Sequence, residues 1–183
     1  MKVKVRGYRE SDKAALVTLL EQLLDYQASV DDRKRLRRMP GFGESFARRM
    51  LRKVAKKNGR IFVAEAGSEV VGVVIGIVVE QTKEDRLEHI PARFGETLEL
   101  VVRDGHRGKG IGTTLLRRME AYFSQKKCNI VGIGLLAANS NAYHLYGSLG
   151  YEDRAHYMTK ELPIHRPPGP GWWTSLLGYR FAN

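Results

Sequence analysis

The chain has 183 residues, of which 43% are hydrophobic and 28% are charged. This length corresponds to roughly one domain of ~150 residues. The composition is that of a globular protein with an apolar core, which excludes a wholly disordered chain. A disulfide scaffold is excluded because Cys128 is the only cysteine. The longest apolar run, Val70 to Val79, is far shorter than the ~20 residues of a transmembrane helix. Lys and Arg total 31 against 20 Asp and Glu, a net charge of +11 that favours polyanionic partners such as nucleic acid or phosphorylated cofactors.

The N-terminal residues Met1 to Arg6 alternate charged residues with valine. This pattern lacks the apolar stretch of a signal peptide. Together with the single cysteine, it leads us to expect a protein of the reducing cytoplasm that has no membrane partner.

The first half of the chain predicts one strand, two helices and two more strands. Lys2 to Tyr8 alternates like a half-buried strand. A helix is predicted from near Lys13, after Ser11 or Asp12 as its cap. Five residues at helical spacing form its buried stripe: Leu16, Leu19, Leu20, Leu23 and Gln27. The remaining elements of this half are a basic helix at 44–57, a strand at 61–66 and a strand at 69–80 whose Val, Ile and Gly residues suit burial on both faces.

The second half predicts three strands and two helices after a polar excursion. The excursion spans Gln81 to Gly95. The predicted strands after it are Glu96 to Val102, Ile130 to Leu136 and Tyr157 to Leu162. The predicted helices are Ile111 to Lys126, which follows a glycine-rich turn Asp104 to Lys109, and Ser140 to Leu149. The resulting order, β-α-α-β-β-β-α-β-α-β, mixes helices with a partly antiparallel sheet, so we expect an α+β or mixed α/β fold.

Residues 1–162 are predicted to form one domain, and residues 163–183 a tail without regular period. The tail holds four of the six prolines and both tryptophans, Trp172 and Trp173. It is either an extension that wraps the domain through its tryptophans or a stretch foreign to the natural chain. The sequence does not decide between them, and we assign the tail no function.

The residues most indicative of chemistry form a glycine-rich turn between a strand and a helix. Gly108, Gly110 and Gly112 lack a Cβ, so the backbone there can approach an anion closely. The first N–H groups of the following helix have no internal partner, and the helix dipole adds positive potential. Arg107 and Lys109 add side-chain charge. The segment therefore predicts a phosphate-binding site.

Three phosphate-binding motifs can be compared with this turn. The Walker spacing G-x-x-x-x-G-K-[ST] is absent, and the dinucleotide spacing G-x-G-x-x-G does not fit Gly108, Gly110 and Gly112. The pattern Arg-x-x-Gly-x-Gly is satisfied by Arg107, Gly110 and Gly112. It resembles motif A of the GNAT superfamily of N-acetyltransferases.

Three further matches support this resemblance. The preceding strand ends Leu100-Val101-Val102, five residues before Arg107. The segment from Asn139 to Tyr151 resembles the superfamily's motif B, and Val5 to Asp12 resembles its first strand and the start of its first helix. The resemblance covers residues 2–162. It implies an acyl-CoA N-acyltransferase fold, with a mostly antiparallel central sheet, one splayed parallel strand pair and helices on both faces.

The resemblance also implies acetyl-coenzyme A as cosubstrate, bound in the gap that a bulge opens beside the Leu100–Val102 strand. Unpaired backbone groups of that strand would bond the pantetheine amides. The residues implied in binding are Leu100, Val101, Val102, Arg107, Gly108, Lys109, Gly110, Ile111, Gly112, Thr113 and Asn139. Asn139 fits equally well as a simple helix N-cap. His106 is expected to contact solvent or the adenosine side of the cosubstrate.

For catalysis, the resemblance implies Tyr146 as the general acid that protonates the leaving thiolate, with Tyr143 facing elsewhere. A carboxylate or ordered water must deprotonate the amine, and Glu96 or Glu99 matches the position of a base in some members. Because a regular strand alternates, these two side chains are predicted on opposite faces, with only one toward the acceptor. No nucleophile elbow or metal-ligand spacing is present, so we expect direct transfer without a metal.

The acceptor is left open. The segments 28–43 and 81–95 match the acceptor-binding regions of the superfamily. Four acids in or directly before the second segment could attract a cationic amine: Glu80, Glu84, Asp85 and Glu88. Two alternatives to an enzyme remain: a nucleic-acid- or ribosome-binding module that uses the basic helix at 44–57, and a sensor that binds acetyl-coenzyme A without transfer. The oligomeric state, a homodimer included, is also left open.

Overall fold

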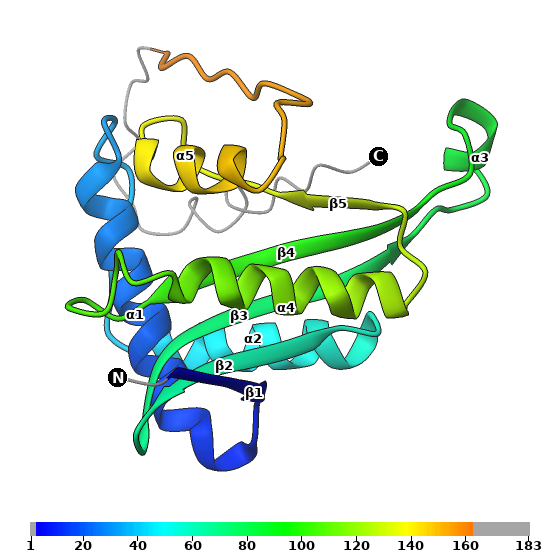
Figure 1. Cartoon of the computed structure of the whole chain (residues 1–183). Helices are drawn as coiled ribbons and strands as arrows, with labels where there is room; N and C mark the ends of the chain where they lie inside the picture. The colour runs from blue at the N-terminus through cyan, green and yellow to red at the C-terminus, as the bar shows by residue number, and fades with distance from the viewer. Residues whose placement is uncertain (1–2, 163–183) are drawn as a thin grey trace. The chain divides into compact units, whose positions relative to one another are not determined.

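The computed structural model describes residues 3–162, and five strands in sequential order form its sheet (Figure 1). They are β1 (Val3–Gly7), β2 (Arg60–Ala66), β3 (Glu69–Glu80), β4 (Arg93–Val102) and β5 (Ile130–Ile133). Strands β1 to β4 pair antiparallel, and β4 pairs with β5 in parallel. The predicted mixed sheet with a single parallel pair is confirmed.

Helices cover both faces of the sheet. They are α1 (Lys13–Val30), α2 (Phe42–Lys56), the short α3 (Asp85–Glu88), α4 (Ile111–Gln125) and α5 (Ser140–Ser148), and a 3₁₀ turn at Glu10–Asp12 precedes α1. Figure 1 shows α4 in front of the sheet and α2 behind it. On the first face, Leu16 and Leu20 of α1 and Met50 of α2 pack against Val73 and Ile75. On the second face, Leu115, Met119 and Phe123 of α4 pack against Val74 and Val78.

Two strand glycines let α4 approach the sheet closely. A Cβ at Gly95 would lie 2.3 Å from the Phe123 ring, and one at Gly76 would lie 2.6 Å from the same ring. Real Cβ atoms do not come this close to a ring, so Phe123 fills the space that two missing side chains leave over β3 and β4.

A β-bulge interrupts the pairing of β3 with β4. Ile75 lies opposite Glu99 and Gly76 lies opposite Thr97, so Leu98 is an extra residue on β4. The pairing of β4 with β5 ends at the same place, with Thr97 opposite Ile133. A bulge bends and twists its strand locally. The parallel pair therefore separates from Leu98 onward.

Two predicted strand boundaries were wrong. Strand β5 was predicted to reach Leu136 but ends at Ile133, because β4 offers it no partner beyond Thr97. Strand β4 begins at Arg93 rather than Glu96, since the excursion returns early to pair with Glu80 of β3.

The chain divides into two compact units, Met1–Tyr151 and Glu152–Asn183. In the second unit residues 152–162 are described, and none of them is in a helix or strand. The predicted strand Tyr157–Leu162 is therefore wrong: an alternating pattern forms a strand only where a partner strand pairs with it. The predicted tail, residues 163–183, lies outside the described residues. None of the helices within residues 3–162 has both the length and the apolar character needed to cross a membrane.

Candidate active site

Among residues 3–162, no strand covers the open edge of β4 beyond Thr97. Residues 98–102 continue β4 and pair with β3 on one side only. Val101 is buried in the core on the α1 side, whereas Leu100 and Val102 pack against the α4 side. The side chains are thus core, and the backbone groups on the open side need partners from outside the sheet. This edge is one wall of what we call the gap between β4 and β5.

The turn after β4 has the geometry of an anion-binding loop. Gly105, Gly108 and Gly110 have φ of +77°, +73° and +73°, and a Cβ at any of them would meet no atom within 4 Å. Left-handed backbone is costly for residues other than glycine, so strain rather than crowding selects glycine here. Gly110 is the N-cap of α4 and has no side chain to cap the helix. The N–H groups of the first turn therefore remain available to an anion.

The two cations of this turn hold the loop together. The Arg107 Nε donates to the Val102 carbonyl at 3.0 Å, and its Nη2 lies 3.0 Å from Asp104 Oδ1. The Lys109 Nζ donates to the Gly105 carbonyl at 2.7 Å. Their charges remain in the loop, while their side chains fix its backbone. The His106 Nδ1 is buried and has no hydrogen-bond partner among the described residues.

Tyr26 of α1 is a site residue that the sequence analysis did not single out. Its ring lies under the Arg107 guanidinium, 4.4 Å from centroid to Cζ. Its hydroxyl donates to Asn139 Oδ1 at 3.2 Å. One side chain thus connects the loop before α4 with the start of α5. No pattern around Tyr26 predicted this contact, because α1, the loop and α5 are far apart in the sequence.

Helix α5 begins after Asn139 and carries Tyr146 near its end. Asn139 is its N-cap, accepting the Ala142 N–H at 3.2 Å, so the predicted capping role is confirmed. Tyr146 packs against the core on the α4 side, 6.0 Å between ring centroids from Tyr151. Burial, and secondarily the nearby Glu99 charge, raise the pKa of Tyr146 to about 12. The hydroxyl is therefore protonated at neutral pH. Tyr143 is 51% exposed on the same helix.

The prediction that Glu96 and Glu99 face opposite sides of the sheet is wrong. Glu96 lies opposite Ile77 and Glu99 opposite Ile75. Residues two apart on β3 share a face, and directly opposed residues point the same way. On a regular strand, residues three positions apart point to opposite faces. The extra residue Leu98 lies between Glu96 and Glu99, so both carboxylates lie on the side covered by α1 and α2.

The two carboxylates differ in environment. Glu96 is exposed, whereas Glu99 is partly buried. Burial raises the pKa of Glu99 to about 7, and the opposing effect of Arg49 and Lys53 on α2 is smaller. Tyr146 and Leu100, the residue after Glu99, pack against the same apolar cluster, and the Glu99 charge contributes to the raised pKa of Tyr146. The strand with the open edge thus carries a carboxyl whose pKa is near neutrality, and its charge acts on a protonated phenol of α5.

Comparison with known proteins identifies the family of this chain. Residues 20–151 match the model of the "Acetyltransferase (GNAT) family". The chain belongs to this family. The resemblance found in the sequence is confirmed, and the matched region is an acetyl-coenzyme A-dependent N-acetyltransferase domain.

Two relatives show how far the similarity to other GNAT proteins extends. The chain is 25% identical to the thialysine N-epsilon-acetyltransferase of Mus musculus over 154 residues, covering 82% of this chain and 84% of that protein. It is 32% identical over 94 residues to an uncharacterized N-acetyltransferase of Methanocaldococcus jannaschii. That match covers 51% of this chain and about half, 53%, of the relative's length.

Solved structures share the GNAT fold with this chain. A predicted acetyltransferase with acetyl-CoA from Clostridium acetobutylicum superposes with a TM-score of 0.68 at 15% identity, covering 90% of this chain and all of that one. The glucosamine-6-phosphate N-acetyltransferase of Arabidopsis thaliana gives 0.62 at 18% identity, covering 88% and 99%. At these identities the likeness is one of fold.

The residues present fit the acetyl-coenzyme A that GNAT proteins use. The open edge of β4 offers backbone donors and acceptors to a chain of amides, and the uncapped first turn of α4 offers N–H groups to phosphates. Among residues 3–162 no group of three His, Cys, Asp or Glu side chains is arranged to hold a metal ion.

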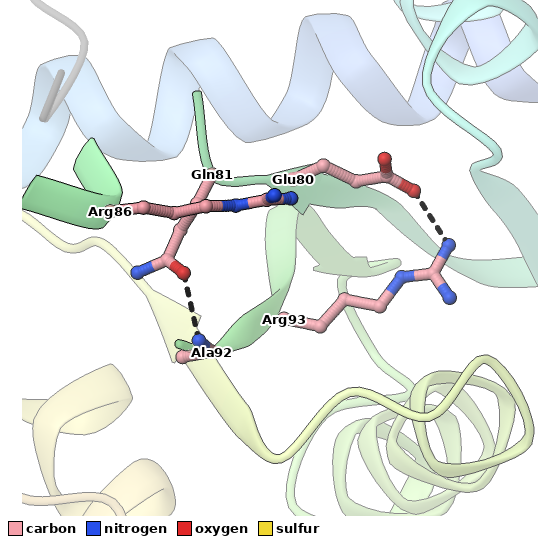
Figure 2. Close-up of a pocket in the computed structure, with 5 residues that line it drawn as sticks. All are labelled: Glu80, Gln81, Arg86, Ala92 and Arg93. Atoms are coloured by element: carbon pink, nitrogen blue, oxygen red, sulfur yellow. Dashed lines mark hydrogen bonds and ion pairs between the residues drawn. The ribbon is translucent and has the colours of Figure 1, made fainter. Parts of the chain in front are cut away.

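A hollow of about 250 Å³ lies at the opposite end of β4 from this gap. Figure 2 shows its lining by Glu80, Gln81, Arg86, Ala92 and Arg93. Glu80 and Arg93 form an ion pair at 2.7 Å, and Gln81 accepts the Ala92 N–H at 2.8 Å. At about 3.3 Å per residue, six residues of β4 separate it from Glu99 by about 20 Å. The excursion predicted to bind the acceptor contributes this hollow, away from the gap.

Proposed function

We propose that this chain transfers the acetyl group of acetyl-coenzyme A directly to a primary amine, with Glu99 as the base and Tyr146 as the proton donor. The observation that carries the proposal is the bulge at Leu98, which opens the gap beside β4 and turns Glu99 toward the α1–α2 side. The name of the mouse relative, which acts on an amine, agrees with this acceptor class.

The cosubstrate residues proposed are those of the β4 edge and the loop. Backbone groups of 100–102 would bond the pantetheine amides, and the turn from Arg107 to Thr113 would bond the pyrophosphate. Acetyl-coenzyme A supplies an activated thioester carbonyl. The strand N–H groups at the gap are suited to stabilise negative charge on that carbonyl oxygen. Asn139 has its side-chain oxygen engaged by α5 and Tyr26, which leaves its amide group for the pantetheine.

We favour Glu99 over Glu96 as the base because its environment matches the task. An amine arrives as an ammonium ion and must lose a proton before its nitrogen can attack the carbonyl carbon. A base works best with a pKa near the working pH, and burial raises the pKa of Glu99 to about 7. Glu96 is exposed.

Tyr146 is proposed to donate its proton to the sulfur as the carbon–sulfur bond breaks. Its pKa of about 12 is higher than the ~8.5 of a thiol, which opposes full proton transfer. The ionised Glu99 contributes to this elevation. When Glu99 takes the proton of the amine it becomes neutral, and the pKa of Tyr146 falls. The two transfers therefore assist one another. Glu99 gains one proton from the ammonium, Tyr146 gives one to the sulfur, and the second proton that the nitrogen loses as the amide forms restores the Tyr146 phenol through water.

Calorimetric titration with acetyl-coenzyme A and with coenzyme A, each at two salt concentrations, tests the binding half of the proposal. We expect micromolar binding that changes little with salt, because backbone contacts dominate. Release of free thiol in the presence of primary amines then tests transfer. Absence of binding would refute the proposal, and steep salt-dependent binding of RNA or DNA instead would favour a phosphate-directed module.

A further inference from the structure

Helix α2 carries two cations along one side of its buried face. Three of its residues are buried against the sheet: Gly43, Ala47 and Met50. At 3.6 residues per turn, Phe46, Arg49 and Lys53 follow one another along one side of this buried face. The Arg49 guanidinium lies 4.5 Å from the Phe46 ring centroid, which fixes its position at that side. We call Arg49 and Lys53 the α2 cation pair.

The α2 cation pair acts on the proposed reaction centre. Glu99 lies opposite Ile75, on the face of the sheet against which Met50 of α2 packs, and Arg49 directly precedes Met50. In agreement with this placement, both cations oppose the rise in the pKa of Glu99. Within residues 3–162 neither of them forms an ion pair with a carboxylate at 4.0 Å or less. Two cations thus lie on the α1–α2 side of the gap, near Glu99, without a direct counter-ion.

The acids that the sequence suggested for attracting a cationic acceptor are elsewhere. Glu80 is paired with Arg93 at the far end of β4. Asp85 accepts the Thr82 N–H at 2.7 Å within the excursion that contains α3. With Glu99 taken up by the reacting amine, the α2 cation pair and the exposed Glu96 remain on this side to meet the rest of the acceptor, a balance that disfavours a polyamine.

We propose that Arg49 and Lys53 select an acceptor that carries a carboxylate in addition to its primary amine. The inference rests on the proposed function, since it takes Glu99 as the group that the amine meets. An amine directed to Glu99 brings the rest of the molecule along the side of α2. A carboxylate there gains two favourable charge interactions, whereas a second ammonium is repelled.

The test compares three acceptors with the same six-carbon chain: 6-aminohexanoate, hexylamine and 1,6-diaminohexane. The measured quantity is kcat/KM for thiol release from acetyl-coenzyme A. We expect the order acid, neutral amine, diamine, with the acid about tenfold above hexylamine, as two partly exposed charge pairs allow. The preference should shrink as ionic strength rises, because salt screens such pairs.

Variants then assign the preference to residues. The R49Q/K53Q double variant should lower the ratio of kcat/KM for the acid to that for hexylamine by about tenfold. The ratio is the right readout because any change in the titration of Glu99 affects both amines alike and cancels. R48Q/R52Q is the matched control: it removes the same charge from exposed positions of the same helix and should leave the ratio unchanged.

The outcomes separate the two proposals. Acetylation of all three amines without preference, a preference for the diamine, or an unchanged ratio in R49Q/K53Q would overturn the inference and leave the proposed function intact. Thiol release from none of the three amines by a protein that binds acetyl-coenzyme A would refute both.

Discussion

Replacing Glu99 with glutamine should slow acetyl transfer and, at the same time, stabilise the folded domain at neutral and alkaline pH. Burial raises the pKa of this carboxyl from its ordinary 4.5 to about 7, so the folded state holds the ionised form at a cost. A glutamine keeps the size of the side chain and has no charge to bury. Loss of activity combined with a gain in stability is typical of a residue kept for function.

The magnitude follows from the two pKa values. At 1.36 kcal/mol per pKa unit, the difference between 4.5 and about 7 corresponds to a cost of about 2–3 kcal/mol, allowing for the partial exposure of the residue. Below pH 4.5 the carboxyl is neutral in both states and costs nothing. As pH rises through 4.5 the unfolded chain ionises first, so folded stability falls until the folded carboxyl ionises near pH 7. The E99Q variant should escape this fall.

Unfolding by urea at pH 4 and at pH 8 measures the effect. We expect E99Q and the unsubstituted protein to have nearly equal free energies of unfolding at pH 4, and E99Q to gain about 2–3 kcal/mol at pH 8. In kinetic assays kcat/KM should fall by about 10²-fold or more, the contribution of a general base. The acidic limb of the pH profile near pH 7 should vanish. E96Q, at an exposed position of the same face, is the matched comparison.

Two results would refute the reasoning separately. If E99Q gained the same stability at both pH values, the effect would not come from burying a charge at position 99. If E99Q gained stability at pH 8 but kept both full activity and the acidic limb of its pH–activity profile, the carboxyl of Glu99 would be buried as described but would not be the base.

Three further predictions concern the proton donor, the loop and its support. Y146F should lower kcat by about 10²-fold with little change in acetyl-coenzyme A affinity, whereas Y143F should leave kcat intact; a wild-type kcat in Y146F would remove Tyr146 from the reaction. G110V should abolish calorimetric binding of acetyl-coenzyme A, and G67V, which imposes a similar left-handed strain (φ +65° against +73°) at the turn between β2 and β3, should preserve it. Binding retained by G110V would exclude this loop as the phosphate site. Y26L should weaken acetyl-coenzyme A binding more than Y26F does, because phenylalanine keeps the ring under Arg107 and loses only the bond to Asn139; equal affinities would mean that the ring does not support the loop.

The sequence by itself determined those features that depend on neighbouring residues. Alternation and helical spacing located the strands at 3–7 and 60–80 and the helices α1, α2, α4 and α5 to within a few residues. The glycines at 108 and 110 predicted a turn whose backbone can approach an anion closely, which is a local property of residues without a Cβ. The family resemblance depended on the same local motifs, and the match over residues 20–151 confirms it.

Only the tertiary structure decided the features that depend on pairing between distant segments. A bulge is a mismatch between two strands, so no pattern within β4 alone could place Leu98 or show that Glu96 and Glu99 share a face. The end of β5 at Ile133 and the absence of a strand at 157–162 likewise depend on whether a partner edge is present. Tyr26 joins Arg107 to Asn139, 113 residues away in the chain, and the sequence contained no sign of this contact. Periodicity determines which faces a segment can bury, and only packing determines what those faces meet.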